Sequence, residues 1–225
     1  MNWFKRIRQK NIMERESSPA AGVPAAAIAP VPPEKGEEER GNDQDGAREK
    51  LLAASGVERV FTAGNRKIHV LKGIDIELEP RQLVMLRGRS GSGKTTLLNL
   101  LGGLDLPTRG EIYFRGQPLH LLNDDKRTLL RRSKIGFIFQ TYALMPLLSA
   151  YENVELALRL ANFPADQWND RAVRCLDLVG LKKRMHHRPY EMSGGEQQRV
   201  AIAKAIAHRP ELILADEPTA ELDSQ

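Results

Sequence analysis

Residues 88–95 have a composition and spacing suited to holding a chain of phosphates. The segment reads Gly-Arg-Ser-Gly-Ser-Gly-Lys-Thr and fits the pattern G-x-x-x-x-G-K-[ST]. Glycines let backbone N–H groups turn inward around the β- and γ-phosphates, Lys94 adds a positive charge, and the Thr95 hydroxyl can ligate Mg²⁺. The residues assigned to this phosphate site are Gly88, Arg89, Ser90, Gly91, Ser92, Gly93, Lys94, Thr95 and Thr96.

An acidic pair follows a short apolar run near the end of the chain. Residues 212–215 are Leu-Ile-Leu-Ala, which can bury both faces in a parallel sheet, and Asp216 and Glu217 come next. Ligands of α/β folds bind at the carboxyl ends of such strands, so Asp216 is predicted to hold the same Mg²⁺ as Thr95. Glu217 is then the candidate general base for a water aligned on the γ-phosphate. Taken alone, the pair fits a solvated turn before Pro218 equally well, but the phosphate loop upstream favours the metal site.

A third segment, residues 193–197, combines a helix cap with two glycines. Ser193 and Glu196 fit a capping box, in which the two side chains satisfy free N–H groups at a helix start. Capping alone does not require Gly194 and Gly195. Residues without side chains let a ligand approach the N–H groups closely, and the helix dipole favours an anion there. Both interpretations can hold together.

The elements that must position these segments follow from the hydrophobic pattern. Short apolar runs predict main-sheet strands, and alternating runs predict an antiparallel flap. The main-sheet strands are predicted at residues 83–86, 135–139 and 212–215, and the flap strands near 57–62, 74–78 and 111–114. Helices are predicted at residues 95–101, around 151–161 and 165–179, and directly after Ser193. The predicted fold class is α/β.

In order and spacing, these segments resemble the nucleotide-binding subunits of ATP-binding cassette (ABC) transporters. Residues 192–198, Met-Ser-Gly-Gly-Glu-Gln-Gln, are similar to the family's signature. Phe139 and Gln140 resemble the Q-loop, and residues 220–223, Ala-Glu-Leu-Asp, resemble the D-loop. The resemblance runs from about residue 51 to the last residue.

Within the family, three stretches most resemble the lipoprotein-releasing and macrolide-exporting branch, LolD and MacB. They are residues 102–105, 135–140 and 152–156. The resemblance implies a P-loop NTPase core of the ABC type, with a mostly parallel sheet, an antiparallel β flap and an inserted helical subdomain at about residues 141–192.

The resemblance also implies a homodimer that encloses two ATP molecules with Mg²⁺. Each ATP would be held by the phosphate loop of one copy and by Ser193, Gly194, Gly195 and Glu196 of the other. The implied catalytic residues are Glu217, Gln140 and Lys94, the implied metal ligands are Thr95, Gln140 and Asp216, and Asp223 is an implied nucleotide contact. ATP hydrolysis would drive an integral membrane permease, and no nucleic acid partner is expected.

Several positions depart from the family's pattern. Phe61 stands where the family usually has a Tyr stacked on adenine, and a buried strand residue is an equally good interpretation of it. Arg89 replaces the usual Pro of this branch, and Ala143 replaces a common Asn. Relatives also place a switch-loop histidine beyond the D-loop, whereas the last histidine here, His208, precedes Asp216. We therefore expect a chain truncated at its C-terminus that binds nucleotide weakly and barely hydrolyses it.

Composition sets the remaining expectations. The length of 225 residues suits one α/β domain at 51–225, preceded by a disordered extension at 1–50 that is rich in Pro, Ala and acidic residues. The absence of a long apolar run or a signal peptide predicts a cytoplasmic protein, held at the inner face of the cell membrane by its permease.

Two other function classes remain open. One is a DNA-acting ABC-type ATPase, which would use the net charge of +5 but needs long coiled-coil arms between Q-loop and signature. The other is a regulatory or inactive nucleotide-binding module, suggested by the missing histidine.

Overall fold

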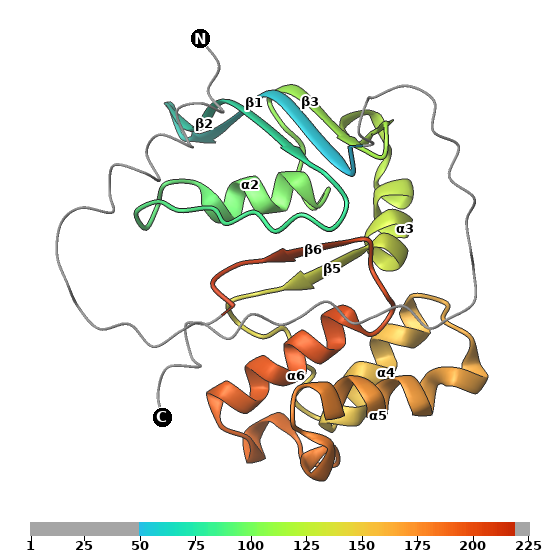
Figure 1. Ribbon diagram of the computed structural model, residues 1–225. Coiled ribbons are helices and arrows are strands. Elements are labelled where there is room, and N and C mark those ends of the chain that lie inside the picture. The colour runs from blue at the N-terminus through green and yellow to red at the C-terminus, as the bar shows by residue number, and fades with distance from the viewer. Residues whose placement is uncertain (1–49, 219–225) are drawn as a thin grey trace, which may run out of the picture. The chain divides into compact units, whose positions relative to one another are not determined.

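The computed structural model describes residues 50–218, which form one antiparallel and one parallel sheet with five α-helices (Figure 1). The four-stranded antiparallel sheet has the order β2-β1-β3-β4, and β5 and β6 form a parallel pair. The strands are β1 Leu52–Ala63, β2 Arg66–Leu78, β3 Arg109–Phe114, β4 Gln117–Pro118, β5 Ile135–Ile138 and β6 Leu212–Ala215.

The helices are α2 Lys94–Leu101, α3 Asp124–Lys134, α4 Ala150–Leu160, α5 Trp168–Leu178 and α6 Gly194–Ile206. Short 3-10 turns lie at η1 Leu119–Leu121, η2 Ala165–Gln167, η3 Lys182–Arg184 and η4 Pro189–Glu191. The predicted flap strands, the strand before Asp216 and the helix after the phosphate loop are confirmed. The predicted N-terminal extension, apart from residue 50, and the D-loop lie outside the described residues.

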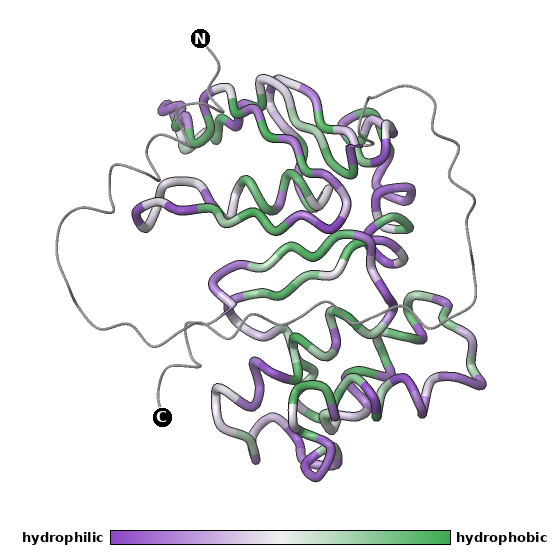
Figure 2. The backbone as a smooth tube through the Cα atoms, in the orientation of Figure 1, coloured by the Kyte–Doolittle hydropathy of each residue, from purple (hydrophilic) through white to green (hydrophobic). Residues whose placement is uncertain are grey.

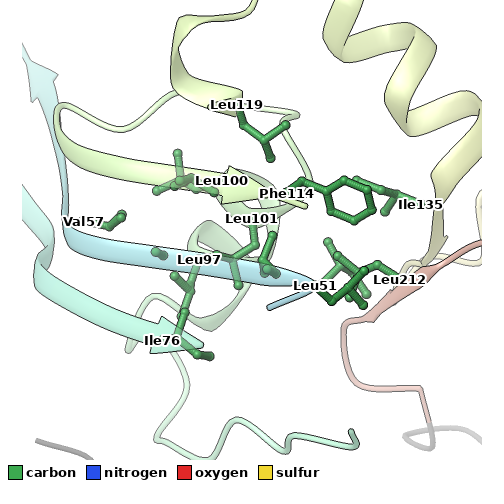
Figure 3. Packing of buried hydrophobic residues seen from close by; sticks show 14 of the residues in the cluster. Leu51, Val57, Ile76, Leu97, Leu100, Leu101, Phe114, Leu119, Ile135 and Leu212 are labelled. Atoms are coloured by element: carbon green, nitrogen blue, oxygen red, sulfur yellow. The ribbon is translucent and has the colours of Figure 1, made fainter. Parts of the chain in front are cut away.

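Helix α2 packs between the antiparallel sheet and the β5–β6 pair. Its residues Leu97, Leu100 and Leu101 are buried in one apolar cluster, which Figure 3 shows from close by. The antiparallel sheet contributes Val57, Ile76, Ile112 and Phe114 to this cluster, and the parallel pair contributes Ile135, Leu212 and Leu214. Each fully buried side chain of this size contributes roughly 1.5–3 kcal/mol. This burial fixes the start of α2, and so the phosphate loop, against both sheets.

A second apolar cluster joins α4, α5 and α6. Among its fully buried side chains are Val154, Leu158, Leu176 and Val200. Figure 2 shows the apolar residues of these helices gathered where the helices face one another, as expected for amphipathic helices. The signature segment at the start of α6 is therefore held by the packing of α6 against α4 and α5.

Helix α6 also lies directly against β5, because Gly136 has no side chain. A Cβ added at Gly136 would lie 2.5 Å from the carbonyl oxygen of Ala205 on α6 and 3.1 Å from Cγ of Pro210. The lack of a side chain at Gly136 thus leaves room for α6, which carries the signature, to pack next to β5, which leads to Gln140.

The predicted strand at residues 83–86 is wrong. Leu83 and Met85 are 92% and 69% exposed, and within residues 50–218 no strand pairs with this segment. An apolar run favours burial, but a strand also needs a neighbour to bond its N–H and C=O groups. The described residues provide no such neighbour, so the run stays irregular.

Helix α3 was not predicted, because it has no buried apolar stripe. None of its 11 residues is buried. Its start is capped by Asn123, whose Oδ1 accepts a hydrogen bond from Lys126 N at 3.0 Å. Asp124 and Asp125 occupy its first turn, and basic residues occupy its last turn, which matches the helix dipole at both ends.

Over the described part of the chain, no helix is long and apolar enough to cross a membrane.

Candidate functional site

The phosphate loop is an exposed segment that runs directly into α2. Gly91 and Gly93 have φ values of 75° and 91°, in a backbone region that residues with a side chain rarely adopt. A Cβ added at Gly93 would lie 3.0 Å from Leu71 Cδ2 and 3.1 Å from Val70 Cγ1. Glycine at this position therefore lets the loop pack against β2 and turn sharply into the helix.

Lys94 is the first residue of α2, and its ammonium group folds back over the loop. Its Nζ donates to the carbonyl oxygens of Gly88 at 3.0 Å and Arg89 at 3.2 Å. In the described part of the chain, no carboxylate forms an ion pair with Lys94. Two neutral acceptors thus hold a cation without neutralising it, which leaves its charge available to an anionic ligand.

The fold brings Thr95 to Asp216, two residues that lie 121 positions apart. The Thr95 hydroxyl donates to Asp216 Oδ2 at 2.6 Å. Asp216 follows β6 directly, and its N–H donates to Ile138 O at 2.9 Å, continuing the β5–β6 pairing. A hydroxyl beside a carboxylate offers the hard oxygen ligands that Mg²⁺ prefers.

A second pair lies at the same edge of the parallel sheet. The register pairs Ile138 with Ala215, so β5 and β6 end together. Gln140 and Glu217 follow these ends, and Gln140 Nε2 donates to Glu217 Oε2 at 3.2 Å. Both side chains are exposed. The predicted water-activating base and its neighbour are thus side by side and open to a ligand.

The signature segment forms the start of α6. Ser193 is the N-cap: its Oγ accepts from Glu196 N at 3.3 Å, and Glu196 Oε2 accepts from Ser193 N at 2.9 Å. The hydrogen bond from the Ser193 backbone, together with the Arg184 guanidinium 3.0 Å away, lowers the pKa of Glu196. The predicted capping box is confirmed.

Gly194 and Gly195 lie half-buried in the first turn of α6. Across residues 50–218, no hydrogen bond or ion pair connects this turn to the phosphate loop. Within one chain, the phosphate loop therefore lies beside Asp216 and Glu217. The signature segment makes no bond to the phosphate loop within the described part of the same chain.

The remaining predicted residues divide into three groups. Thr96 is half-buried on α2, and Arg89, Ser90 and Ser92 are exposed in the loop. Phe61 lies on β1, is 38% exposed, and has the Arg59 guanidinium 4.5 Å from its ring centroid. It is absent from both buried clusters, so the buried-strand interpretation is not supported, and adenine stacking stays a prediction. Asp223 lies outside the described residues.

Two side-chain contacts made by α6 were not predicted from the sequence. Gln198 is 2% exposed, and its Nε2 donates to Pro218 O at 2.9 Å. Lys204 Nζ donates to Ala143 O at 2.7 Å. They reach the two loops that carry Glu217 and Gln140. No local pattern signals such contacts, because their partners lie far away along the chain.

Comparison with known proteins gives the family. The profile of the ABC transporter family matches residues 71–220. The macrolide export ATP-binding/permease protein MacB of Wolinella succinogenes is 48% identical over 78% of this chain, which spans 27% of that protein. The lipoprotein-releasing system ATP-binding protein LolD of Hydrogenovibrio crunogenus is 47% identical, over 77% of this chain and 75% of its own length.

A solved structure agrees with the sequence relatives. It is the dimeric, post-hydrolysis ATP-binding cassette MJ0796 bound to ADP and phosphate. It is 42% identical with a TM-score of 0.73, and the match covers 77% of each chain. The fold is that of an ABC-type P-loop NTPase, and this chain belongs to the ABC transporter family.

Proposed function

We propose that this chain is the ATP-binding and ATP-hydrolysing subunit of an ABC transporter of the LolD/MacB type. The observation that carries the proposal is the meeting of two pairs, Thr95 with Asp216 and Gln140 with Glu217, at the carboxyl ends of β6 and β5. The uncompensated charge of Lys94 lies at the start of the helix that carries Thr95. These groups are the ones that phosphoryl transfer to water requires.

The residues have separate roles in this scheme. The phosphate loop and Lys94 bind the β- and γ-phosphates, and the loop glycines let N–H groups approach them. Glu217 accepts a proton from the attacking water. As this happens, the water oxygen bonds to the γ-phosphorus and the bond from that phosphorus to the leaving ADP oxygen breaks. Gln140 donates to Glu217 and so orients its carboxylate.

The oxygen-rich pair fits a magnesium ion. Thr95 and Asp216 would hold it with Gln140, and phosphate oxygens would complete the set. When bound, Mg²⁺ supplies neutralisation of the phosphate charge. A hydroxyl that already lies 2.6 Å from the carboxylate needs little rearrangement to share a cation with it.

A homodimer around two Mg-ATP would complete each site with Ser193, Gly194, Gly195 and Glu196 of the second copy. The support is that this segment, although it is a helix start with two glycines, makes no bond to the phosphate loop within the described chain. The dimeric relative bound to ADP and phosphate adds to this support. Asp223 would contribute from the D-loop, and Phe61 would stack on adenine with the ring face that Arg59 leaves uncovered.

The domain organisation belongs to the same proposal. We infer one nucleotide-binding domain at residues 51–225, with a helical subdomain at about 141–192 whose helices α4 and α5 pack on α6. A membrane permease would be the partner, and it would hold this subunit at the inner face of the cell membrane. The names of the relatives, which belong to macrolide export and lipoprotein release, support this arrangement.

The described structure does not favour a DNA-acting ATPase. That class needs long coiled-coil arms between the Q-loop and the signature. The α-helices between Gln140 and Ser193 are α4 and α5, with 11 residues each, and they pack together in a compact cluster.

The decisive experiment is the Glu217→Gln substitution in the full natural chain, studied with ATP and Mg²⁺. Removal of the base stops the chemical step but leaves phosphate binding intact, so ATP should accumulate in a closed dimer. ATP turnover should fall about 100-fold or more. Size-exclusion chromatography with light scattering would show the dimer in ATP and the monomer in ADP.

A Lys94→Ala variant is the matched control, because it removes the phosphate contact and should prevent ATP from forming any dimer. Unchanged ATP turnover in Glu217→Gln would contradict the assignment of the base. Tight ATP binding without a dimer would indicate a passive nucleotide-binding module instead.

A further inference from the structure

The turn that follows Gln140 has an unusual backbone. Tyr142 and Ala143 have φ values of 61° and 51°, so two consecutive residues other than glycine lie in the left-handed region. A side chain disfavours that region, and such a conformation persists only where surrounding contacts impose it. Within the turn, Tyr142 N donates to Phe139 O at 3.2 Å and Ala143 N donates to Thr141 O at 2.7 Å.

A contact from α6 holds this turn from outside. The ammonium group of Lys204 donates to the carbonyl oxygen of Ala143 at 2.7 Å. Lys204 is half-buried, and burial lowers the pKa of its side chain. None of the carboxylates in the described chain forms an ion pair with it. A half-buried cation bonded to a neutral carbonyl contributes little to folding by itself. Its position instead suits holding the backbone of the turn.

The same helix holds the other hydrolytic loop. Gln198 Nε2 donates to Pro218 O at 2.9 Å, directly after Glu217. Glu217 is also in the left-handed region, with φ 49°. Lys204 and Gln198 are separated by about 9 Å along one helix. Gln198 binds the residue that follows Glu217, and Lys204 binds the turn that follows Gln140.

We propose that Lys204 is a positioning residue for ATP hydrolysis, which holds the turn at residues 140–143 so that Gln140 stays within hydrogen-bond reach of Glu217. This inference rests on the proposed function, because it assigns Lys204 a part in the same hydrolytic site. Lys204 touches neither nucleotide nor water in this scheme. It acts through the Ala143 carbonyl, and α6 serves as the rigid frame that fixes both loops.

The test compares Lys204→Met with Lys204→Arg and with Lys126→Met in the full natural chain. Methionine keeps the apolar stem but loses the donor, and the loss of a half-buried charge without an ionic partner in the described chain should leave the fold intact. Arginine keeps a donor. Lys126 lies exposed on α3, so its substitution controls for the loss of a lysine. The measurements are the ATP Kd, kcat, and amide hydrogen exchange at residues 141–144.

For Lys204→Met we expect kcat to fall about 10-fold or more while the ATP Kd stays within about 2-fold, since a displaced catalytic group affects the transition state rather than ground-state binding. Exchange at residues 141–144 should rise. Lys204→Arg should recover most of kcat, and Lys126→Met should match the unmodified protein. In an Ala143→Gly background the effect of Lys204→Met should shrink, because glycine adopts the left-handed region without an outside contact.

Three results would overturn the proposal. They are an unchanged kcat in Lys204→Met, a parallel loss of ATP affinity and kcat, and a rise in exchange along the whole of α6, which would indicate a general structural role. If Lys204→Met does not fold, Lys204→Gln supplies the same comparison. Absence of ATP turnover in the unmodified full chain would instead refute the proposed function, so the two failures are distinguishable.

Discussion

At the scale of single residues, the position of the Thr95 hydroxyl depends on two parts of the chain that are far apart in sequence. It is fixed by the first turn of α2 on one side and by the carboxylate of Asp216, 2.6 Å away, on the other. A serine or threonine after the loop lysine can therefore share a cation with Asp216 only if β6 ends close to the start of α2. The β5–β6 register sets that place.

Substitution of Thr95 by Ala should weaken the response to Mg²⁺ rather than the binding of ATP alone. It removes one of the oxygen ligands and leaves Asp216 without its hydrogen-bond donor. We expect the Mg²⁺ concentration for half-maximal ATP turnover to rise about 10- to 100-fold, measured by titration at saturating ATP. Thr128→Val on α3 is the control, and an equal Mg²⁺ response in Thr95→Ala and the unmodified protein would contradict the ligand assignment.

At the scale of elements, the close approach of α6 to β5 depends on Gly136. The carbonyl oxygen of Ala205 lies 2.5 Å from the position that a Cβ would take, and a packed helix backbone cannot shift without disturbing its other contacts. This approach also sets the reach of Lys204 and Gln198 to the two loops. Strand, helix and loops thus form one packed unit.

Replacement of Gly136 by Ala should lower the free energy of unfolding by about 1–3 kcal/mol, the usual cost of overpacking. Urea denaturation followed by circular dichroism would measure it. Ser55→Thr adds the same methyl group at an exposed position of β1 and should change stability by less than about 0.5 kcal/mol. Equal stability of the two variants would contradict the close contact between β5 and α6.

At the scale of the described molecule, His208 lies where the helical cluster returns to the parallel sheet. Its Nε2 is buried without a hydrogen-bond partner. Burial, with a further contribution from the nearby Arg171 charge, lowers the pKa of its imidazole below 6.5, although a hydrogen bond with the Ile135 backbone opposes the shift. The folded chain therefore favours the neutral imidazole.

The free energy of unfolding should consequently fall as the pH drops below 6.5, because the unfolded chain then binds a proton that the folded chain resists. The pKa values of Glu152, Glu196 and Glu211 are lowered from 4.5, so their effect appears only at lower pH. Urea denaturation at about pH 7.5 and pH 5.5 would measure the fall. His208→Gln should reduce it and His69→Gln should not; an equal fall in His208→Gln would exclude His208 as its source.

The sequence by itself determined which groups are available for chemistry and much of the local structure. The phosphate loop, the capping box at Ser193 and Glu196, the flap strands and the strand before Asp216 were all predicted, because each has a recognisable pattern within a short stretch of the chain. The roles in ATP binding and hydrolysis assigned to the individual site residues, and the domain bounds, remain predictions.

Only the tertiary structure decided features that depend on distant partners. The apolar run at residues 83–86 is not a strand, because a strand requires a neighbour that no local pattern supplies. Helix α3 forms through end charges and a cap instead of a buried stripe. The reach of Lys204 to Ala143 and of Gln198 to Pro218 arises because packing around Gly136 brings remote segments together. Thr95 and Asp216 were expected to share a cation, and packing around the α2 leucines is what brings them within 2.6 Å of each other. Local sequence specifies which groups are available, and burial of shared apolar surface specifies which of them meet.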